Sequence, residues 1–138
     1  MNAVDTNVLI YVHDEREPEK KKAATELVRN LEDGLLLWQV ACEYVAASRK
    51  LVPQGYTPED ARRDVDDLRH LWKTSLPKWE TFERSAGVII RYSLSFWDSL
   101  MVAACLEAGA ETLYSENFGG QNEIDGLKIV NPFASTTD

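Results

Sequence analysis

The chain has 138 residues, 44% of them hydrophobic, which is enough to bury a core without disulfides or metal ions as staples. Charged residues make up 28%, and no low-complexity run interrupts the sequence, which excludes a disordered or fibrous chain. The formal net charge of −8 argues against bulk electrostatic attraction to nucleic acid.

We expect neither a secretory signal nor a membrane-spanning segment in this chain. Its apolar runs are far shorter than the ~18 residues that a transmembrane helix needs. Residues 1–5 lack the basic region and the long apolar segment of a signal peptide. We therefore expect a cytoplasmic protein that does not contact a membrane. Cys42 and Cys105 lie in apolar helical patterns, so we expect both to be reduced thiols in the core.

Strands and helices alternate in the N-terminal part of the chain. A buried strand begins at residue 3, and Asp5-Thr6-Asn7 then favours a turn or a helix cap, because short polar side chains bond the local backbone. A helix follows over 18–33, with proline at its start and glycine just after its end. After it we expect a short buried strand at 35–38 and a helix over 40–51.

The alternation continues to the C-terminus. Thr57-Pro58-Glu59-Asp60 is typical of a helix start, and that helix is predicted to extend to residue 73. The remaining predicted elements are a strand at 75–79, helices over 80–92 and 97–109, and strands at 112–115 and 127–130. Short apolar strands between helices indicate parallel pairing with helices on both faces, so we expect residues 1–138 to form one α/β domain.

Three carboxylates lie in apolar stretches with no cation at helical spacing: Asp5, Glu43 and Asp98. A carboxylate on an apolar face costs several kcal/mol of desolvation unless something compensates it. These acids must therefore protonate, pair with distant cations or share a metal ion. Magnesium prefers such oxygen ligands, and a divalent ion can lower the pKa of a bound water during phosphodiester cleavage.

Each of these acids also has a structural alternative. Ser95 and Asp98 have the spacing of a capping box, so Asp98 could simply cap its helix. Asp5 could be a turn residue satisfied by the backbone, and Glu43 could pair with a remote arginine. The sequence leaves these alternatives open.

Cations are concentrated in the middle of the chain, at Arg49, Lys50, Arg62, Arg63, Arg69 and Lys73. A polyanion would have to dock there, or a metal cation would have to bridge it to the acidic parts. The alternative is that these side chains form solvated helix faces.

With these residues in view, the chain resembles the PIN-domain nucleases, and most closely the VapC-type toxins of toxin–antitoxin pairs. The order and spacing of four segments carry the resemblance. They are Asp5-Thr6-Asn7-Val8-Leu9-Ile10-Tyr11, Glu43 in the helix after the second strand, Trp97-Asp98-Ser99-Leu100 at the start of a late helix, and Leu113-Tyr114-Ser115-Glu116-Asn117-Phe118.

The resemblance implies an α/β/α sandwich with a central, mainly parallel sheet and an acidic Mg²⁺ or Mn²⁺ site. It implies a single-strand-directed endoribonuclease that cuts RNA, with an antitoxin as partner and a homodimer as its assembly. The residues that match the family's metal-binding and catalytic acids are Asp5, Glu43 and Asp98. The residues that match or adjoin its supporting positions are Thr6, Asn7, Ser115, Glu116 and Asn117.

The sequence departs from the family at its fourth acidic position. Asn117 stands where the family has an aspartate, and Glu116 is adjacent to it. The departure leaves a second hypothesis open, in which a catalytically impaired PIN fold serves as an RNA- or protein-binding module. A third hypothesis, a receiver- or phosphatase-like domain, requires paired acids at one strand end, and Asp5-Thr6-Asn7 supplies only one.

Overall fold

The structure is a computed structural model that describes residues 1–134. Its strands are β1 (Asn2–Val4), β2 (Gly34–Leu37), β3 (Lys73–Ser75), β4 (Thr112–Tyr114), β5 (Glu123–Ile124) and β6 (Leu127–Val130). Its helices are α1 (Thr6–Tyr11), α2 (Pro18–Asn30), α3 (Trp38–Ala47), α4 (Pro58–Leu71), α5 (Trp79–Tyr92) and α6 (Phe96–Ala108), and a 3₁₀ helix, η1 (Ser48–Gln54), follows α3.

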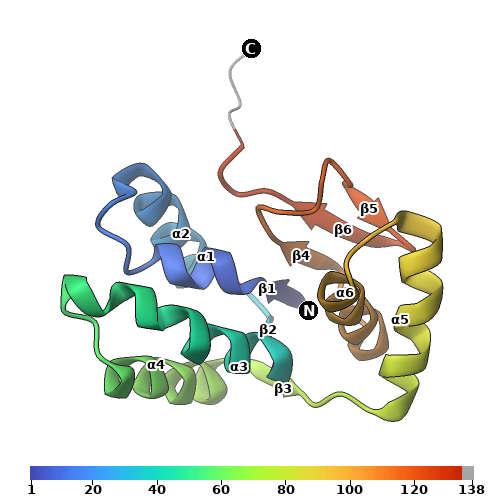
Figure 1. The fold of residues 1–138 in the computed structure, drawn as a ribbon, viewed down its shortest axis with the longest axis horizontal. Coiled ribbons are helices and arrows are strands. Elements are labelled where there is room, and N and C mark those ends of the chain that lie inside the picture. The colour runs from blue at the N-terminus through green and yellow to red at the C-terminus, as the bar shows by residue number, and fades with distance from the viewer. Residues whose placement is uncertain (135–138) are drawn as a thin grey trace.

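The strands form one sheet in the order β3-β2-β1-β4-β6-β5. All neighbouring pairs are parallel except β5 and β6, which are antiparallel. Helices α1 to α4 lie on one side of the sheet and α5 and α6 on the other (Figure 1). The expected α/β/α sandwich is confirmed, with β1 at the centre of the sheet between β2 and β4.

The sheet is buried because helices cover both of its faces. Every residue of β2 is buried, as expected of a parallel strand without a solvent-facing side. The inner part of the opposite layer is α6, where Met101, Val102 and Cys105 are almost fully buried. The helices on both faces therefore hold the sheet in place, and the polar residues that follow its strands lie at its edge.

Most helix ends follow the sequence signals. Asp5 caps α1, because its side chain accepts a hydrogen bond from the N–H of Thr6. Thr57 and Asp60 form the reciprocal capping box that was expected at the start of α4. Gly109 ends α6 in the left-handed region, with φ of 79°.

Several expectations were wrong in detail. The helix predicted over 40–51 ends at Ala47 and is followed by the 3₁₀ helix η1, and the helix predicted over 18–33 ends at Asn30. The strand predicted at 75–79 lies at Lys73–Ser75, because Pro77 cannot donate a hydrogen bond to a ladder. Strand β5, only two residues long, was not predicted. Cys105 is buried as expected, but Cys42 is exposed, because it lies on the outer face of α3.

Within residues 1–134, no single helix is long and apolar enough to cross a membrane. Helices α5 and α6 meet the length and composition criteria only as a pair, and the chain bends by 117° between them.

Candidate active site

Four of the predicted site segments meet at the carboxyl edge of the sheet. Asp5 follows β1 and Ser115 follows β4, and these two strands are parallel neighbours. The N–H of Asp5 donates to the carbonyl of Tyr114 at 2.8 Å, so the two strand ends are directly bonded. Glu43 lies on α3 and Asp98 in the first turn of α6, and both of these helices begin near this edge.

Hydrogen bonds hold the carboxylate of Asp5 from two sides. The hydroxyl of Ser115 donates to Oδ2 of Asp5 at 2.6 Å, and the N–H of Thr6 donates to Oδ1 at 2.6 Å. Asp5, Thr6 and Ser115 are all buried. The orientation of the Asp5 carboxylate is therefore fixed by neutral donors.

The same network continues from Thr6 to the other two helices. The hydroxyl of Thr6 donates to Oε1 of Glu43 at 3.1 Å, and the side-chain amide of Gln39 donates to Oε2 of Glu43 at 3.2 Å. The Gln39 amide also donates to the carbonyl of Trp97 at 3.0 Å, one residue before Asp98. This network connects α1, α3 and α6 around the three acids.

The ionisation of Asp5 shows that the acids lie within electrostatic range of one another. Burial raises the pKa of Asp5 to about 6, the hydrogen bonds from Ser115 and Thr6 oppose that rise, and repulsion from Asp98 and Glu43 adds to it. Burial also raises the pKa of Asp98, with a lowering contribution from Ser95 and a further rise from Glu43. The predicted acids are thus brought together in space.

No cation neutralises this cluster in the part of the chain that the structure describes. None of the ion pairs among residues 1–134 includes Asp5, Glu43 or Asp98. The alternative that Glu43 pairs with a remote arginine is therefore wrong for these residues. Asp5 does cap α1, and the N–H of Asp98 does bond Ser95 at 3.1 Å, but neither contact supplies a positive charge.

The two residues after Ser115 differ in their surroundings. The carboxylate of Glu116 pairs with Lys20 and accepts a hydrogen bond from the hydroxyl of Tyr11 at 2.9 Å. Asn117 is exposed, and its N–H donates to the hydroxyl of Ser115 at 3.3 Å. Glu116 is therefore charge-compensated by α2, and Asn117 stands at the surface beside Ser115.

The donor chemistry of the cluster suits a hard divalent cation. Three carboxylates offer oxygen ligands without a competing cation, and magnesium binds through a few carboxylates while it retains several waters. Three further side-chain oxygens, on residues close in sequence to the acids, are buried without a hydrogen-bond partner in residues 1–134: Oδ1 of Asn7, Oε1 of Gln39 and Oγ of Ser99. In the same residues, no three His, Cys, Asp or Glu side chains form a preformed metal-binding group.

Sequence reasoning did not assign two polar residues of this region. Gln39 lies four residues before Glu43 on the same helix face, and that spacing was the available signal. Lys20 reaches Glu116 across 96 residues of sequence, and no local pattern indicates that contact.

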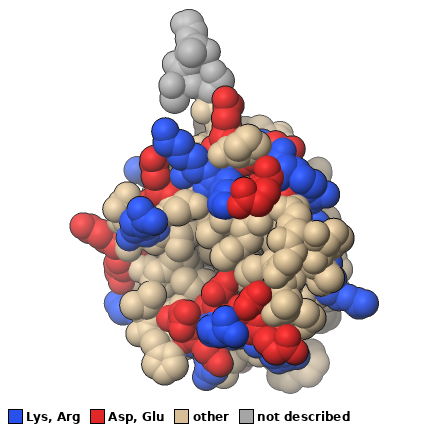
Figure 2. All heavy atoms as spheres, turned by 90° about the vertical axis from the view of Figure 1, so that its left-hand side faces the viewer, with Lys and Arg blue, Asp and Glu red and all other residues tan. Residues whose placement is uncertain are grey.

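The cations of the middle segment are partly neutralised. Three of the six are in ion pairs: Arg63 with Asp60, Arg69 with Asp66 and Lys73 with Asp33. Figure 2 shows the face formed by the left-hand helices of Figure 1, where positive and negative side chains alternate and form no continuous cationic stripe. All six side chains are exposed; five lie on η1 and α4, and Lys73 lies on β3. The interpretation as solvated helix faces therefore fits the five helical side chains.

Comparison with known proteins identifies the family. The family model described as "PIN domain" matches residues 3–126. No curated protein sequence matches the chain.

Solved structures with the same fold cover nearly the whole chain at low identity. A toxin–antitoxin complex from Klebsiella pneumoniae has a TM-score of 0.72 and 18% identity, over 96% of this chain and 98% of that one. VapC20 from Mycobacterium tuberculosis, described as a sarcin–ricin loop cleaving toxin, has a TM-score of 0.66 and 14% identity, over 86% and 92%. VapBC2 from Rickettsia felis, bound to a DNA fragment from its promoter, has a TM-score of 0.63 and 14% identity, over 93% and 96%.

Proposed function

Because the chain belongs to the PIN-domain family, we propose that it is a metal-dependent endoribonuclease that cleaves single-stranded RNA as the toxin of a toxin–antitoxin pair. One observation carries the proposal: Asp5, Glu43 and Asp98 form a negatively charged cluster that no cation compensates within residues 1–134. Similar folds described as a toxin–antitoxin complex and as a sarcin–ricin loop cleaving toxin support it.

In this proposal Asp5, Glu43 and Asp98 hold Mg²⁺ or Mn²⁺. When bound, the cation neutralises phosphate charge and lowers the pKa of a water. The reaction is hydrolysis: a bond forms between the water oxygen and phosphorus, and one ester bond of the phosphodiester breaks.

Neighbouring residues orient the carboxylates of the acid cluster. Ser115 and Thr6 fix both oxygens of Asp5, so the carboxylate needs little reorganisation when it binds. Thr6 and Gln39 fix the two oxygens of Glu43 in the same way. In the proposal Asn7, Glu116 and Asn117 support the acids: Asn7 offers an unpaired side-chain oxygen, Glu116 follows Ser115, and Asn117 lines the same pocket as Asp98.

The proposal extends to the assembly and location of the protein. Residues 1–138 form one PIN domain that acts in the cytoplasm, binds a cognate antitoxin protein and forms a homodimer. An antitoxin residue with a guanidinium group would complement the uncompensated carboxylates, since arginine forms strong bidentate bonds with them.

A catalytically impaired PIN fold is the second candidate. It is favoured by the fourth position, where Asn117 is uncharged and exposed and Lys20 neutralises Glu116. In that case the protein would bind RNA or a protein partner without cleaving RNA.

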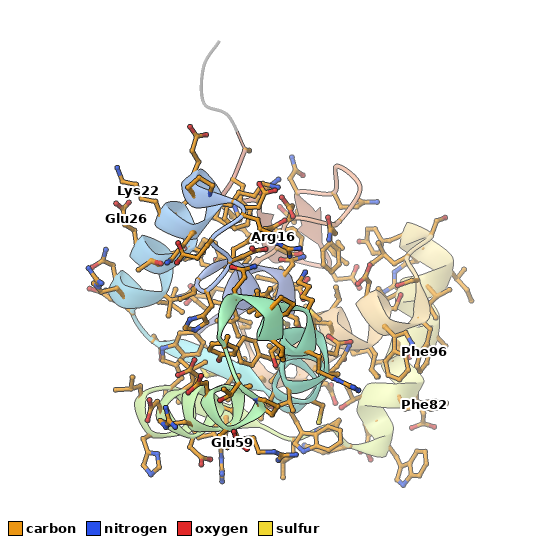
Figure 3. All side chains as sticks on the ribbon, turned by 60° about the vertical axis from the view of Figure 1, so that its left-hand side comes forward. Arg16, Lys22, Glu26, Glu59, Phe82 and Phe96 are labelled. Carbon is orange, nitrogen blue, oxygen red and sulfur yellow. The ribbon has the colours of Figure 1, made fainter. Side chains whose placement is uncertain are left out.

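RNA cleavage by matched variants tests the proposal. We expect wild-type protein to cut single-stranded RNA with Mg²⁺ and to stop in EDTA, while Asp5→Asn is at least 100-fold slower. Glu26→Gln is the matched control, because Glu26 is an exposed acid on the outer side of α2 (Figure 3) and makes no hydrogen bond or ion pair with Asp5, Glu43 or Asp98 within residues 1–134. Equal cleavage by wild type and Asp5→Asn would refute the nuclease proposal.

A further inference from the structure

A polar pocket of about 240 Å³ contains Asp98, one of the three clustered acids. Its walls come from the turn between α5 and α6, from the first turn of α6 and from the loop that follows β4. The volume is several times the ~30 Å³ that one water molecule occupies, so the pocket has room for part of a substrate. A molecule held there would lie next to the proposed active site.

Three polar side chains that line this pocket are not used by the fold. Ser93, Asn117 and Gln121 each donate a hydrogen bond only through the backbone N–H. The Ser93 hydroxyl and the side-chain amides of Asn117 and Gln121 have no protein partner within residues 1–134. By contrast, the hydroxyl of Tyr92 in the same pocket is held by Asp125. One hydroxyl and two amides are therefore free to bind a ligand beside Asp98.

The backbone of Ser93 is unusual for a residue with a side chain. Ser93 ends α5 with φ of 55°, in the left-handed region where glycine is the favoured residue. A Cβ is strained in this conformation, and the Ser93 hydroxyl makes no hydrogen bond within residues 1–134 that would offset the strain. Strained positions of this kind cluster at functional sites. The hydroxyl at this wall of the pocket therefore has no structural role that explains it.

The lining of the pocket indicates which part of a nucleotide would fit. Among residues 1–134, no lysine, arginine or histidine lines it, and Asp98 is its one charged residue, so it does not suit a phosphate. Its aromatic residues offer no open face for base stacking, because Phe118 is only 4% exposed and Tyr92 is partly buried. Neutral hydroxyl and amide groups instead match a sugar, whose hydroxyls both donate and accept hydrogen bonds.

We propose that this pocket is a ribose subsite, in which Asn117, Gln121 and Ser93 hydrogen-bond the 2′-hydroxyl and its neighbouring oxygens. The inference rests on the proposed function, because it places the ribose beside the phosphodiester that the acid cluster would cleave. The 2′-hydroxyl is the group by which a protein distinguishes RNA from DNA, so the pocket selects RNA. An amide at position 117 can donate to that hydroxyl and accept from it, whereas a carboxylate could only accept. Asn117 thus acts in substrate selection.

A neighbouring pocket on the same loop supplies the matched control. It has a volume of about 230 Å³ and is lined by Ser115, Gln121 and Asn122, among others, but not by Asp98, Ser93 or Asn117. Asn122, like Asn117, is an exposed asparagine of the segment between β4 and β5. Asn122→Ala therefore removes the same type of side chain from the same segment without altering the proposed subsite.

Binding of neutral nucleosides tests the subsite without phosphate or metal. The isotope-labelled full chain in EDTA is titrated to millimolar concentrations of adenosine, 2′-deoxyadenosine or 2′-deoxy-2′-fluoroadenosine, and NMR follows the side-chain amides of Asn117 and Gln121. The fluoro analogue retains a ribose-like sugar shape but has no 2′ O–H to donate. We expect adenosine to bind about tenfold more tightly than either analogue, as loss of the hydrogen bonds predicts. Asn117→Ala should reduce this ratio to about twofold, and Asn122→Ala should leave it unchanged.

The outcomes separate this inference from the proposed function. If wild type cleaves RNA in Mg²⁺ but adenosine and 2′-deoxyadenosine bind equally, or neither shifts the two amides, the ribose subsite is refuted and the nuclease proposal stands. If wild type selects adenosine through Asn117 but cuts no RNA, the subsite stands and the nuclease proposal fails. If the fluoro analogue binds like adenosine, or Asn117→Ala keeps the full ratio, these groups do not recognise the 2′-hydroxyl and the subsite is refuted.

Discussion

The hydroxyl of Ser115 donates a 2.6 Å hydrogen bond to Oδ2 of Asp5 across 110 residues of sequence. It joins the ends of two adjacent parallel strands and opposes the burial that raises the pKa of Asp5. Neutral groups alone thus stabilise the most buried charge of the cluster, which leaves its negative charge available to a cation.

The folded protein without metal should lose stability as pH rises. Burial raises the folded pKa of Asp5 from 3.8 to about 6, so between these values the folded state binds more protons than the unfolded state, and the free energy of unfolding falls with increasing pH. At pH 7 the cost is about 3 kcal/mol. In EDTA, Asp5→Asn should therefore melt at a higher temperature than wild type at pH 7. The difference should vanish near pH 4, and a constant difference across this range would contradict the assignment.

Divalent cations should stabilise the protein through the same carboxylate. In the proposed function Mg²⁺ binds the folded cluster and not the dispersed unfolded acids, so it should raise the melting temperature of wild type with increasing concentration. Asp5→Asn should show little of this increase, and Glu26→Gln should show all of it. Calorimetric titration of Mg²⁺ into wild type measures the affinity directly, and absence of binding at millimolar Mg²⁺ would favour the impaired PIN fold.

Replacing Ser115 by alanine should raise the pKa of Asp5 further, because the hydrogen bond that it loses lowers that pKa. The pH at which Mg²⁺ begins to stabilise the protein should therefore move upward relative to wild type. Ser115→Thr, which retains the hydroxyl, should restore the wild-type pH dependence. An unchanged profile for Ser115→Ala would show that the bond does not control the ionisation of Asp5.

Lys20 should determine where the Glu116 carboxylate lies. Lys20→Met removes its cation and leaves Tyr11 as the remaining donor, so Glu116 becomes free to turn toward the acids. We expect lower thermal stability without metal and tighter Mg²⁺ binding, measured by calorimetry. The double variant Lys20→Met with Glu116→Gln should lose the gain in Mg²⁺ affinity. If Lys20→Met alone binds Mg²⁺ like wild type, Glu116 does not reach the site.

Two glycines should respond in opposite directions to alanine. A Cβ at Gly34, the first residue of β2, would lie 2.6 Å from the ring of Trp72, so Gly34→Ala should destabilise the fold by about 1–3 kcal/mol. A Cβ at Gly87, inside α5, meets only the flexible end of Arg91, so Gly87→Ala should stabilise it by about 0.5–1 kcal/mol. Urea unfolding measures both, and combining Gly34→Ala with Trp72→Leu should recover part of the loss.

Local sequence signals predicted the fold best at helix ends, where only a few residue types satisfy the free backbone groups. The capping box at Thr57 and the terminator at Gly109 were confirmed because each satisfies backbone groups that a helix end leaves free. Strand β5 was missed because two residues have no periodicity, and it exists only through pairing with β6. Its formation depends on tertiary contacts that no sequence window contains.

The sequence predicted which acids form the site, but not all of their contacts. Asp5, Glu43 and Asp98 could be selected because each lacked a local cation, and the structure does bring them within electrostatic range. The partner of Glu116 could not be predicted, because Lys20 lies far away in sequence and beside other charged residues. Distances within the cluster depend on the packing of α3 and α6, which sequence patterns do not specify.

Asp5 serves both as the cap of α1 and as the central acid of the cluster, so one side chain contributes to the fold and to the proposed site. Asparagine and serine are also good caps, so a lineage that abandoned the chemistry could exchange Asp5 for either one and still keep the first helix in place. Inactive descendants of such a chain would therefore stay folded, and they could take on a different function.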